Sequence, residues 1–515
     1  MTSNSWQVSS GHAVTTDAAA EILDDGGNAF DALIAAAWAA CVAEPIFCSP
    51  GGGAHALLQP AHAPATVLDC FTQTPLRKRT DRVDFYPIQG NFGTDTQEFH
   101  VGAGAAATPG LVPGLWSLWQ RYASMPMHRL AEPAIRQARD GVELNRTQAL
   151  ALAILEPIVR SSAAAARVFG LDDHRVPLPI EGETVTNAPL AHFLERVCAA
   201  DGLRAYQHQI ADLIGVDSDR HGGHLQAEDI HEYQVTYRSP LEWTLGPCRV
   251  QSNPPPAFGG MMVALMTMGL ERRLPADAQF GSAVHLQCLL QAMQASQDDR
   301  KQLEQPECLR SDELLLQTYR TLNRSATVAR KGTTHISIRD AQHNLAAMTL
   351  SNGEGSGQVV ADCGFMLNNM LGEEDLNRLG FHHWPENRRL ASMMAPTLIE
   401  WTHDDVSDRI LLGSGGANRI RTAIAQVICN QVHFGMSLQH AIDAPRMHLE
   451  DDALAIEWVA DEWPDTALAW LDQHVDESTV RWPARNLYFG GVHAVSDHQA
   501  AADRRRDGAA RSGAR

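Results

Sequence analysis

The chain has 515 residues, of which 44% are hydrophobic and 20% charged, a composition typical of a globular protein. Its formal net charge of −20 argues against nucleic acid as a partner, because phosphate binding needs clustered lysine and arginine. The nine cysteines lack regular spacing, which indicates reduced core thiols rather than a disulfide framework. Residues 1–11 have neither the basic start nor the apolar run of a signal peptide, so we expect a soluble, cytoplasmic protein.

The first part of the chain is expected to be mainly helical. The apolar stretch 30–43 follows two glycines, and it predicts a buried helix because it is too short to span a bilayer. The segments 131–141 and 187–202 each end on glycine, as many helices do. Within residues 252–271, a proline-rich loop leads into a methionine-rich helix whose methionines we expect to fill core.

A change of pattern predicts a boundary at about residue 332. Residues 321–332 form a polar run with little periodicity, which is typical of an exposed linker. From Thr333 to Arg339 the side chains alternate, residues 341–344 supply a turn, and residues 345–350 return as a partner strand. This strand starts without a turn or cap of its own, which is unusual for an ordinary domain junction.

Thr333 is the candidate nucleophile. A threonine hydroxyl reacts poorly unless a base lies within hydrogen-bond reach, and the first residue of a chain carries such a base in its own α-amine. Cleavage of the Gly332–Thr333 bond would create that amine, and glycine tolerates the strained backbone that attack on the preceding carbonyl needs. Taken alone, however, a threonine at the start of a strand is more often purely structural.

The segment 411–432 predicts a strand, a glycine turn and a helix. Its small residues expose backbone N–H groups beside a helix N-terminus, so the turn fits either an oxyanion hole or a tight connection. A phosphate-binding Walker loop is excluded because no Lys-Ser/Thr follows the glycines. The glycine-rich loop 351–357 either lets a ligand approach the backbone or is simply a loop. Histidines at 221, 224, 382 and 383 lack a convincing third ligand, so no metal site is expected.

A series of motifs occurs in one order along the chain. They are GGNAFDALIAAA, EPIFCSPGGG, ATPGLVPGLWSL, LAEPAIRQARDG, PPPAFGG, GTTHISIRD, GFMLNNM, MMAPTL, GSGGANRIRTAI and DAPRMH. In this order they resemble the γ-glutamyltransferase (γ-glutamyltranspeptidase) family of N-terminal-nucleophile hydrolases. The closing AADRRRDGAA also looks like the family's last segment, so we expect a structured C-terminal end.

The resemblance implies an α/β (α+β) protein with a four-layer αββα sandwich, made as one precursor that cleaves itself before Thr333. The large chain would be 1–332, rich in helix, and the small chain 333–515, rich in strand. The implied reaction forms an acyl-enzyme on Thr333 and passes the acyl group from a γ-glutamyl amide to water or to an amino-acid or peptide acceptor. No cofactor, metal, nucleic acid or membrane partner is implied.

Carried over to this chain, the family's site residues fall on identifiable positions. Gly416 and Ala417 would offer the oxyanion N–H groups, and Ser351 would take the place of a threonine near the nucleophile. Asn352 or Gly353 falls at the position of a substrate-binding asparagine. The remaining substrate-binding positions correspond to Glu373, where the family has an aspartate, and to Ser392, the first of two serines.

The departures from the family pattern concern the glutamyl pocket. The second serine of the pair is Met393, and the second oxyanion glycine is Ala417. Phe71 or Thr72 stands where the family has the arginine that pairs with the substrate α-carboxylate, so that carboxylate loses a bidentate partner. Arg77 and Arg79 are the nearest arginines that could replace it.

Three functions remain open at this point. The leading hypothesis is an autoprocessing amidohydrolase or acyltransferase of γ-glutamyl type. The first alternative is an acylase of the same fold for another side-chain amide, of glutaryl or cephalosporin type. The second is an unprocessed relative that only binds ligands, against which the intact Gly332-Thr333-Thr334 sequence argues.

Overall fold

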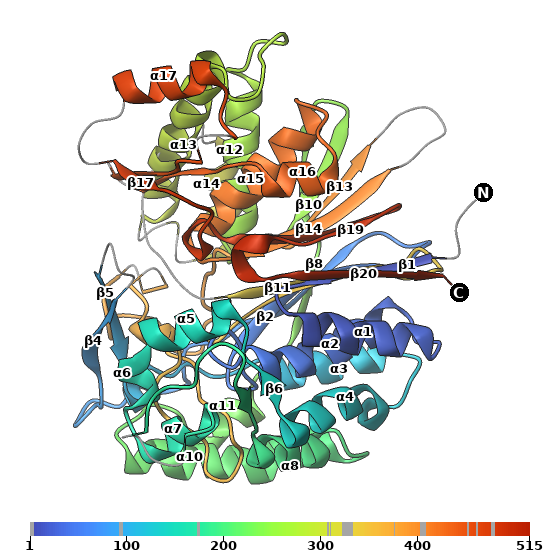
Figure 1. Ribbon diagram of the computed structural model, residues 1–515. Helices are drawn as coiled ribbons and strands as arrows, with labels where there is room; N and C mark the ends of the chain where they lie inside the picture. The colour runs from blue at the N-terminus through green and yellow to red at the C-terminus, as the bar shows by residue number, and fades with distance from the viewer. Residues whose placement is uncertain are drawn as a thin grey trace.

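Two β-sheets pack face to face at the centre of the computed structural model, and helices cover the outer face of each sheet (Figure 1). The structure describes residues 5–91, 96–171, 176–305, 308, 311–321, 333–374, 376–377, 379–401, 408–450, 453–459, 462–474 and 479–514. This arrangement is the four-layer αββα sandwich expected from the sequence.

The first sheet has the strand order β20-β1-β11-β12-β2-β3-β8, and every neighbouring pair is antiparallel. Its strands are β1 (Ser5–Ser10), β2 (Gly53–Gln59), β3 (Thr66–Cys70), β8 (Thr236–Arg238), β11 (Thr334–Arg339), β12 (Leu345–Ser351) and β20 (Ala509–Ala514). The predicted hairpin is confirmed as β11 and β12. It lies in the middle of the sheet, and every residue of both strands is buried, so neither of its faces meets solvent.

The second sheet has the strand order β19-β18-β14-β13-β10-β9. Its strands are β9 (Leu241–Leu245), β10 (Cys248–Ser252), β13 (Thr397–Trp401), β14 (Arg409–Gly415), β18 (Gly491–Ser496) and β19 (Ala500–Ala501). A polar layer separates it from the first sheet at β11: the ring of His335 contacts Thr349 and Ser337 through its two nitrogens, at 2.8 and 2.9 Å. Gly413 on β14 faces this ring, because a Cβ there would lie 2.3 Å from its Cε1 atom.

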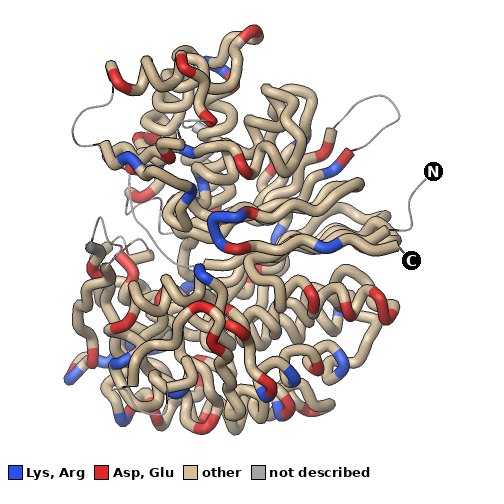
Figure 2. Tube along the Cα trace, in the orientation of Figure 1, with Lys and Arg blue, Asp and Glu red and all other residues tan. Residues whose placement is uncertain are grey.

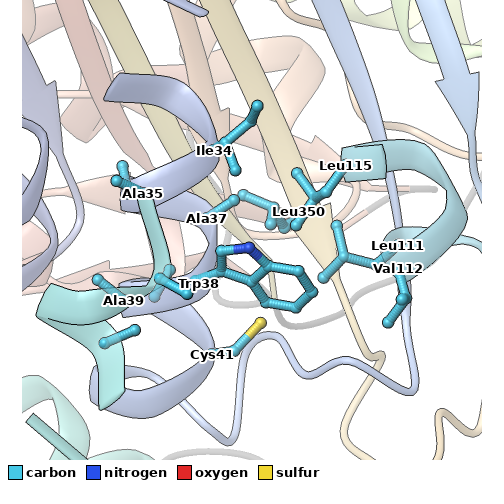
Figure 3. Packing of buried hydrophobic residues seen from close by; sticks show 14 of the residues in the cluster. Ile34, Ala35, Ala37, Trp38, Ala39, Cys41, Leu111, Val112, Leu115 and Leu350 are labelled. Atoms are coloured by element: carbon cyan, nitrogen blue, oxygen red, sulfur yellow. The ribbon is translucent and has the colours of Figure 1, made fainter. Parts of the chain in front are cut away.

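The helices α1 (Ala13–Asp24), α2 (Ala29–Ala43), α3 (Leu111–Tyr122), α4 (Met127–Asp140) and α8 (Ala188–Val197) lie on the side of the first sheet. The predicted buried helix is confirmed as α2, which starts with a capping box at Asn28 and is buried along its whole length. Figure 3 shows Trp38 of α2 packed beside Leu111, Leu115 and Leu350, which joins the helical layer to β12.

The helices α12 (Gly259–Glu271), α13 (Ala283–Leu303), α15 (Arg419–Val432) and α16 (Leu438–Asp443) cover the second sheet (Figure 1). The methionines of α12 lie mostly in the core, as predicted. The other helices are α5 (Arg146–Ile154), α6 (Glu156–Val159), α7 (Ala163–Val168), α9 (Gly202–Ala205), α10 (Ala211–Arg220), α11 (Ala227–His231), α14 (Asp312–Thr321) and α17 (Asp465–His474). The peripheral strands are β4 (Tyr86–Asn91), β5 (Thr96–Val101), β6 (Val142–Glu143), β7 (Thr184–Val185), β15 (Met447–Glu450), β16 (Ala453–Glu457) and β17 (Val480–Trp482).

Each sheet contains strands from both sides of residue 332. The first sheet joins β1, β2, β3 and β8 to β11, β12 and β20, and the second joins β9 and β10 to four later strands. The segments 1–332 and 333–515 therefore share both sheets and could not form separate domains. Gly332 and the linker before it lie outside the described residues.

All nine cysteines are buried and free, as the sequence predicts for core thiols. Within the described ranges, no helix is long and apolar enough to cross a membrane. The same part of the chain contains no group of three or more histidine, cysteine, aspartate or glutamate side chains able to hold a metal ion. Figure 2 shows acidic residues spread over both helical layers rather than gathered on one face in this view.

Candidate active site

Thr333 lies directly before β11 in the centre of the first sheet. The register pairs Thr334 with Leu350, so Thr333 stands opposite Ser351 at the end of β12. The two hydroxyl oxygens are 3.5 Å apart, and the hydroxyl of Ser351 accepts a hydrogen bond of 3.1 Å from the N–H of Gly353. Thr333 is 3% exposed, so its hydroxyl is held inside the sandwich beside the predicted Ser351.

The turn between β14 and α15 lies against the nucleophile. A Cβ on Gly415 would be 2.0 Å from the carbonyl oxygen of Thr333, so only glycine allows this approach. Gly416 and Ala417 follow with φ angles of +113° and +55°. Neither of their N–H groups donates a hydrogen bond to another described residue. The predicted strand, turn and helix are present, and the turn offers two N–H groups beside Thr333, as an oxyanion hole requires.

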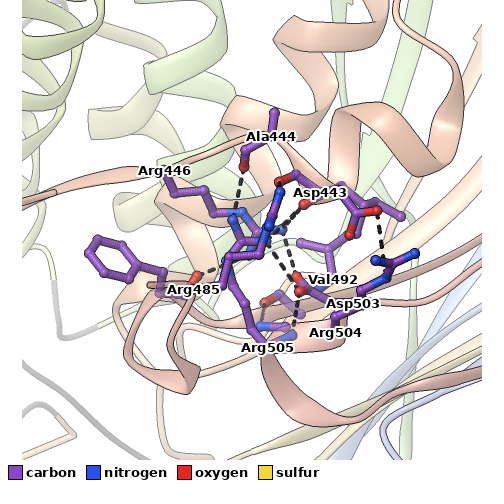
Figure 4. Close-up of polar contacts among 12 residues, drawn as sticks. Asp443, Ala444, Arg446, Arg485, Val492, Asp503, Arg504 and Arg505 are labelled. Carbon is purple, nitrogen blue, oxygen red and sulfur yellow. Dashed lines mark hydrogen bonds and ion pairs between the residues drawn. The ribbon is translucent and has the colours of Figure 1, made fainter. Parts of the chain in front are cut away.

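The C-terminal segment holds the backbone of the nucleophile. Nη1 of the buried Arg506 donates a hydrogen bond of 2.7 Å to the carbonyl oxygen of Thr333. Asp503 anchors the segment, since its Oδ2 accepts hydrogen bonds from Arg446 (2.7 Å) and from the N–H of Val492 (2.9 Å), as Figure 4 shows. Arg446 and Arg505 beside it keep the pKa of Asp503 well below its usual range. The structured end predicted from the sequence is confirmed, whereas the contact of Arg506 with Thr333 was not foreseen.

Glu44, at the end of α2, is a second buried group beside the nucleophile. A Cβ on Gly11 would lie 2.5 Å from the hydroxyl of Thr334 and 2.8 Å from Oε2 of Glu44, so these two groups lie close together at β11. Burial raises the pKa of Glu44 to about 7, against the opposing effects of the Thr334 hydroxyl and the Arg506 charge. Burial likewise lowers the pKa of Arg506 to about 10. The signal in the sequence was an acidic residue directly after the largely apolar stretch 30–43.

A cavity of about 30 Å³ borders the nucleophile, and its walls are largely apolar. The described residues that line it are Phe71, Thr333, Ser351, Met370, Glu373, Leu376, Ser392, Met393, Met394, Ala417, Asn418 and Ile420. This set brings together most of the site residues expected from the sequence, and it adds Asn418. It contains no arginine or lysine, so no cation among these lining residues can meet a substrate carboxylate at the nucleophile.

Of the two residues expected at the position of the family's arginine, Phe71 lines the cavity and Thr72 does not. Phe71 is 1% exposed and stacks on His55, with ring centroids 5.5 Å apart. Arg389 donates a hydrogen bond of 2.5 Å to the carbonyl oxygen of Phe71 and lies 3.3 Å from Asp69. Its charge is therefore paired with Asp69 at the end of β3. Arg79 forms an ion pair of 2.8 Å with Asp219. Neither it nor Arg77 lines the cavity at Thr333.

Two of the expected substrate-binding residues differ in their surroundings. Asn352 does not line the cavity, and its Oδ1 accepts a hydrogen bond of 3.0 Å from Ser49, which ties the loop after β12 to the loop before β2. Glu373 does line the cavity and lies against Gly353, where a Cβ would be 2.3 Å from its Oε1. Gly353, at φ +62°, therefore makes room for the Glu373 carboxylate.

The four-layer αββα sandwich, with Thr333 directly before a central strand and a glycine turn beside it, is the arrangement of an N-terminal-nucleophile hydrolase. The chain matches the γ-glutamyltranspeptidase family over residues 15–513 and belongs to that family. It is therefore an enzyme of the amidohydrolase and acyltransferase type expected from the sequence.

Individual relatives agree with this assignment. The chain is 27% identical to the glutathione hydrolase proenzyme of Escherichia coli over 88% of this chain and 81% of that protein. It is 26% identical to the acylase ACY 1 proenzyme of Pseudomonas sp. (strain V22), over 96% and 90% of the two chains. The crystal structure of cephalosporin acylase from Bacillus halodurans has the same fold, with a TM-score of 0.75, 21% identity and coverage of 99% and 96%.

Proposed function

We propose that the protein is an autoprocessing acylase that cleaves N-acyl amides whose acyl group has no carboxylate within reach of the nucleophile cavity. The observation that carries the proposal is the apolar wall formed by Phe71 and Met393 beside Thr333, without a lining arginine or lysine. An unpaired carboxylate buried there would cost about 3–5 kcal/mol, a loss of two to three orders of magnitude or more in specificity for free γ-glutamyl compounds.

The first step is cleavage of the precursor before Thr333. The hydroxyl of Thr333 attacks the carbonyl carbon of Gly332 and the C–N bond breaks, so the nitrogen takes up the hydroxyl proton and becomes the free α-amine of Thr333. Water then hydrolyses the resulting ester, which releases the carboxylate of Gly332 and restores the hydroxyl of Thr333. The names of two relatives support this step, since both are proenzymes. The products would be chains 1–332 and 333–515, which remain joined through the two shared sheets.

Turnover then uses the same hydroxyl. The α-amine of Thr333 takes the hydroxyl proton while the oxygen attacks the amide carbonyl, and the N–H groups of Gly416 and Ala417 stabilise the oxyanion. The C–N bond breaks, the leaving amine receives the proton, and the acyl group stays on Thr333 as an ester. Water, or an amino acceptor, then attacks the ester and frees the hydroxyl.

Four p-nitroanilides test the proposal with the processed enzyme: γ-glutamyl, glutaryl, 4-aminobutanoyl and butanoyl. They differ only in the presence of the amine and of the carboxylate, so the four kcat/KM values separate the two groups. We expect removal of the carboxylate to raise kcat/KM at least tenfold in both pairs, and the amine to help through Glu373. A higher kcat/KM for the γ-glutamyl compound than for the 4-aminobutanoyl compound would refute the proposal.

A further inference from the structure

A larger pocket lies next to the nucleophile cavity. Its volume is about 420 Å³, within the roughly 300–1,000 Å³ of small-molecule sites. Leu376 lines both spaces, and Ala391 of the larger pocket directly precedes Ser392 of the nucleophile cavity. The N–H of Phe258, another lining residue of the larger pocket, donates a hydrogen bond of 2.8 Å to the carbonyl oxygen of Ser392. The two spaces are thus separated by little more than the segment 390–393 and Leu376.

The larger pocket adjoins the acyl side of the site rather than the oxyanion turn. Its boundary with the nucleophile cavity carries Ser392 and lies beside Glu373 and Met393, the positions at which the family binds the acyl group. None of the residues 414–418 of the oxyanion turn lines the larger pocket. A group that extends from the acyl carbonyl past Leu376 would therefore enter it.

Most of the pocket wall is apolar or aromatic. It includes Pro256, Phe258, Leu315, Leu376, Leu379, Trp384, Pro385, Leu390 and Ala391. Two buried polar atoms of this wall have no hydrogen-bond partner among the described residues, namely Nε1 of Trp384 and Oδ1 of Asn377. Such atoms are costly unless a ligand or water meets them, so the wall is suited to an elongated apolar group with polar substituents.

The charged side chains of the pocket are mainly basic. Lys78 lies 4.7 Å above the ring of Trp384, and Arg388 lines the same wall without an ion pair to another described residue. The third cation, Arg389, lies against Asp69. The lining acid, Asp312, is itself paired with Arg238 at 3.0 Å. Lys78 and Arg388 therefore leave a positive charge that an anionic group would complement.

We propose that this pocket binds the distal part of the acyl group, an apolar chain or ring that ends in an anionic group at Lys78 and Arg388. The inference rests on the acylase function proposed above and names its substrate class. The carboxylate rejected beside Thr333 would be accepted at the far end of a longer acyl group, where cations replace the apolar wall of Phe71 and Met393.

Acyl length tests the proposal. The kcat/KM values of octanedioyl and decanedioyl mono-p-nitroanilides are compared with those of their methyl esters, beside the glutaryl and butanoyl pair. We expect the carboxylate to lower kcat/KM in the short pair and to raise it about tenfold in one of the long pairs, mainly through KM. No benefit from the distal carboxylate at either long length would overturn the pocket assignment. The short pair tests the acylase function separately.

Variants connect the effect to the pocket. In Lys78→Gln/Arg388→Gln the benefit of the distal carboxylate should disappear, while the methyl esters keep their kcat/KM. The matched control Arg139→Gln/Lys301→Gln removes two exposed cations that do not line the pocket. It should change neither the benefit of the distal carboxylate nor the kcat/KM of the methyl esters. Leu379→Glu adds a negative charge at a residue that is 43% exposed. In this variant the long substrates with a free carboxylate should have a lower kcat/KM than their methyl esters. Equal losses for acids and esters in either pocket variant would contradict the proposal.

A third set of substrates tests whether the pocket binds the acyl group or the leaving group of the amide. The same distal acid is placed on the leaving anilide, with butanoyl as the acyl group. If that acid helps and responds to Lys78→Gln/Arg388→Gln, the pocket binds the leaving group and the acyl assignment is wrong. If it has no effect, the acyl assignment stands.

Discussion

The two sides of the cavity at Thr333 differ in polarity. On the nucleophile side, polar groups approach at hydrogen-bond distances: Arg506 holds the carbonyl of Thr333 at 2.7 Å, and the turn at Gly415 packs against the same oxygen. On the opposite side, Phe71 and Met393 present apolar surface to the same cavity. The groups that hold the Thr333 carbonyl and the apolar residues Phe71 and Met393 lie on different elements, so either set can change while the other is kept.

The largest effect is expected from the nucleophile itself. Thr333→Ala should abolish both precursor cleavage and turnover, since both reactions use the same hydroxyl, whereas Thr333→Ser should keep part of each. Gel analysis and N-terminal sequencing of the small fragment, which should read Thr-Thr-His-Ile-Ser, provide the measurement. If the alanine variant were still cleaved at this bond, Thr333 would not be the nucleophile of the cleavage.

The next largest effect is expected from Arg506→Met. Without the hydrogen bond to the Thr333 carbonyl, the nucleophile shifts from its place opposite Ser351, and kcat should fall on the order of a hundredfold. Arg504→Met is the matched control, because the neighbouring side chain is 78% exposed. Steady-state kinetics with the best anilide distinguish the roles. A positioning role lowers kcat with KM nearly kept, whereas an unchanged kcat with a lower Tm would mean that Arg506 only stabilises the fold.

Glu44→Gln should change how stability depends on pH. The pKa of Glu44 in the folded protein is about 7, above its ordinary value of 4.5, so between these two values the folded state binds more protons than the unfolded state. Glu44 therefore makes stability fall as pH rises from about 4.5 to 7. Relative to the original chain, the glutamine variant should gain up to about 3 kcal/mol between pH 5 and pH 8. Denaturant unfolding at both pH values measures this; a constant difference would contradict the raised pKa.

A smaller change is expected on the acyl side from Met393→Ser. The substitution restores the second serine hydroxyl of the family and adds a hydrogen-bond donor beside Ser392. The kcat/KM for γ-glutamyl-p-nitroanilide should rise about tenfold or more, since a hydrogen bond to a charged carboxylate contributes roughly 1.5–3 kcal/mol. The butanoyl anilide serves as control and should not improve. An equal gain for both anilides would show that Met393 restricts space rather than carboxylate recognition.

The smallest effect concerns backbone strain in the oxyanion turn. Ala417 has φ +55°, a conformation that is disfavoured for residues with a Cβ. Ala417→Gly should keep turnover and raise stability by about 0.5 kcal/mol, the relief of strain being partly offset by the greater freedom of glycine when unfolded. Ala417→Val should instead lower the stability. Thermal unfolding of both variants decides this, and a less stable glycine variant would contradict it.

The sequence was most informative where local pattern and structure coincide. The alternation after Thr333 and the turn at 341–344 predicted the β11–β12 hairpin, and the apolar run 30–43 predicted α2. The strand, turn and helix around Gly416 followed equally well, because glycine and small residues specify such a connection by themselves. These features depend on contacts within one short segment, so the periodicity of the side chains reveals them.

Only the tertiary structure decided which distant groups meet at the nucleophile. Arg506 lies 173 residues from Thr333 in sequence, yet it contacts the carbonyl of Thr333 because β20 and β11 both flank β1 in the first sheet. Glu44 reaches Thr334 because α2 packs on the same sheet, and burial there, rather than any neighbour in sequence, raises its pKa. The sequence by itself determined the hairpin and the strand, turn and helix around Gly416, and it predicts Thr333 as the nucleophile. The contact of Arg506 with Thr333, the buried position of Glu44 and the pocket beyond Leu376 arise from sheet order and packing, which no short sequence pattern encodes.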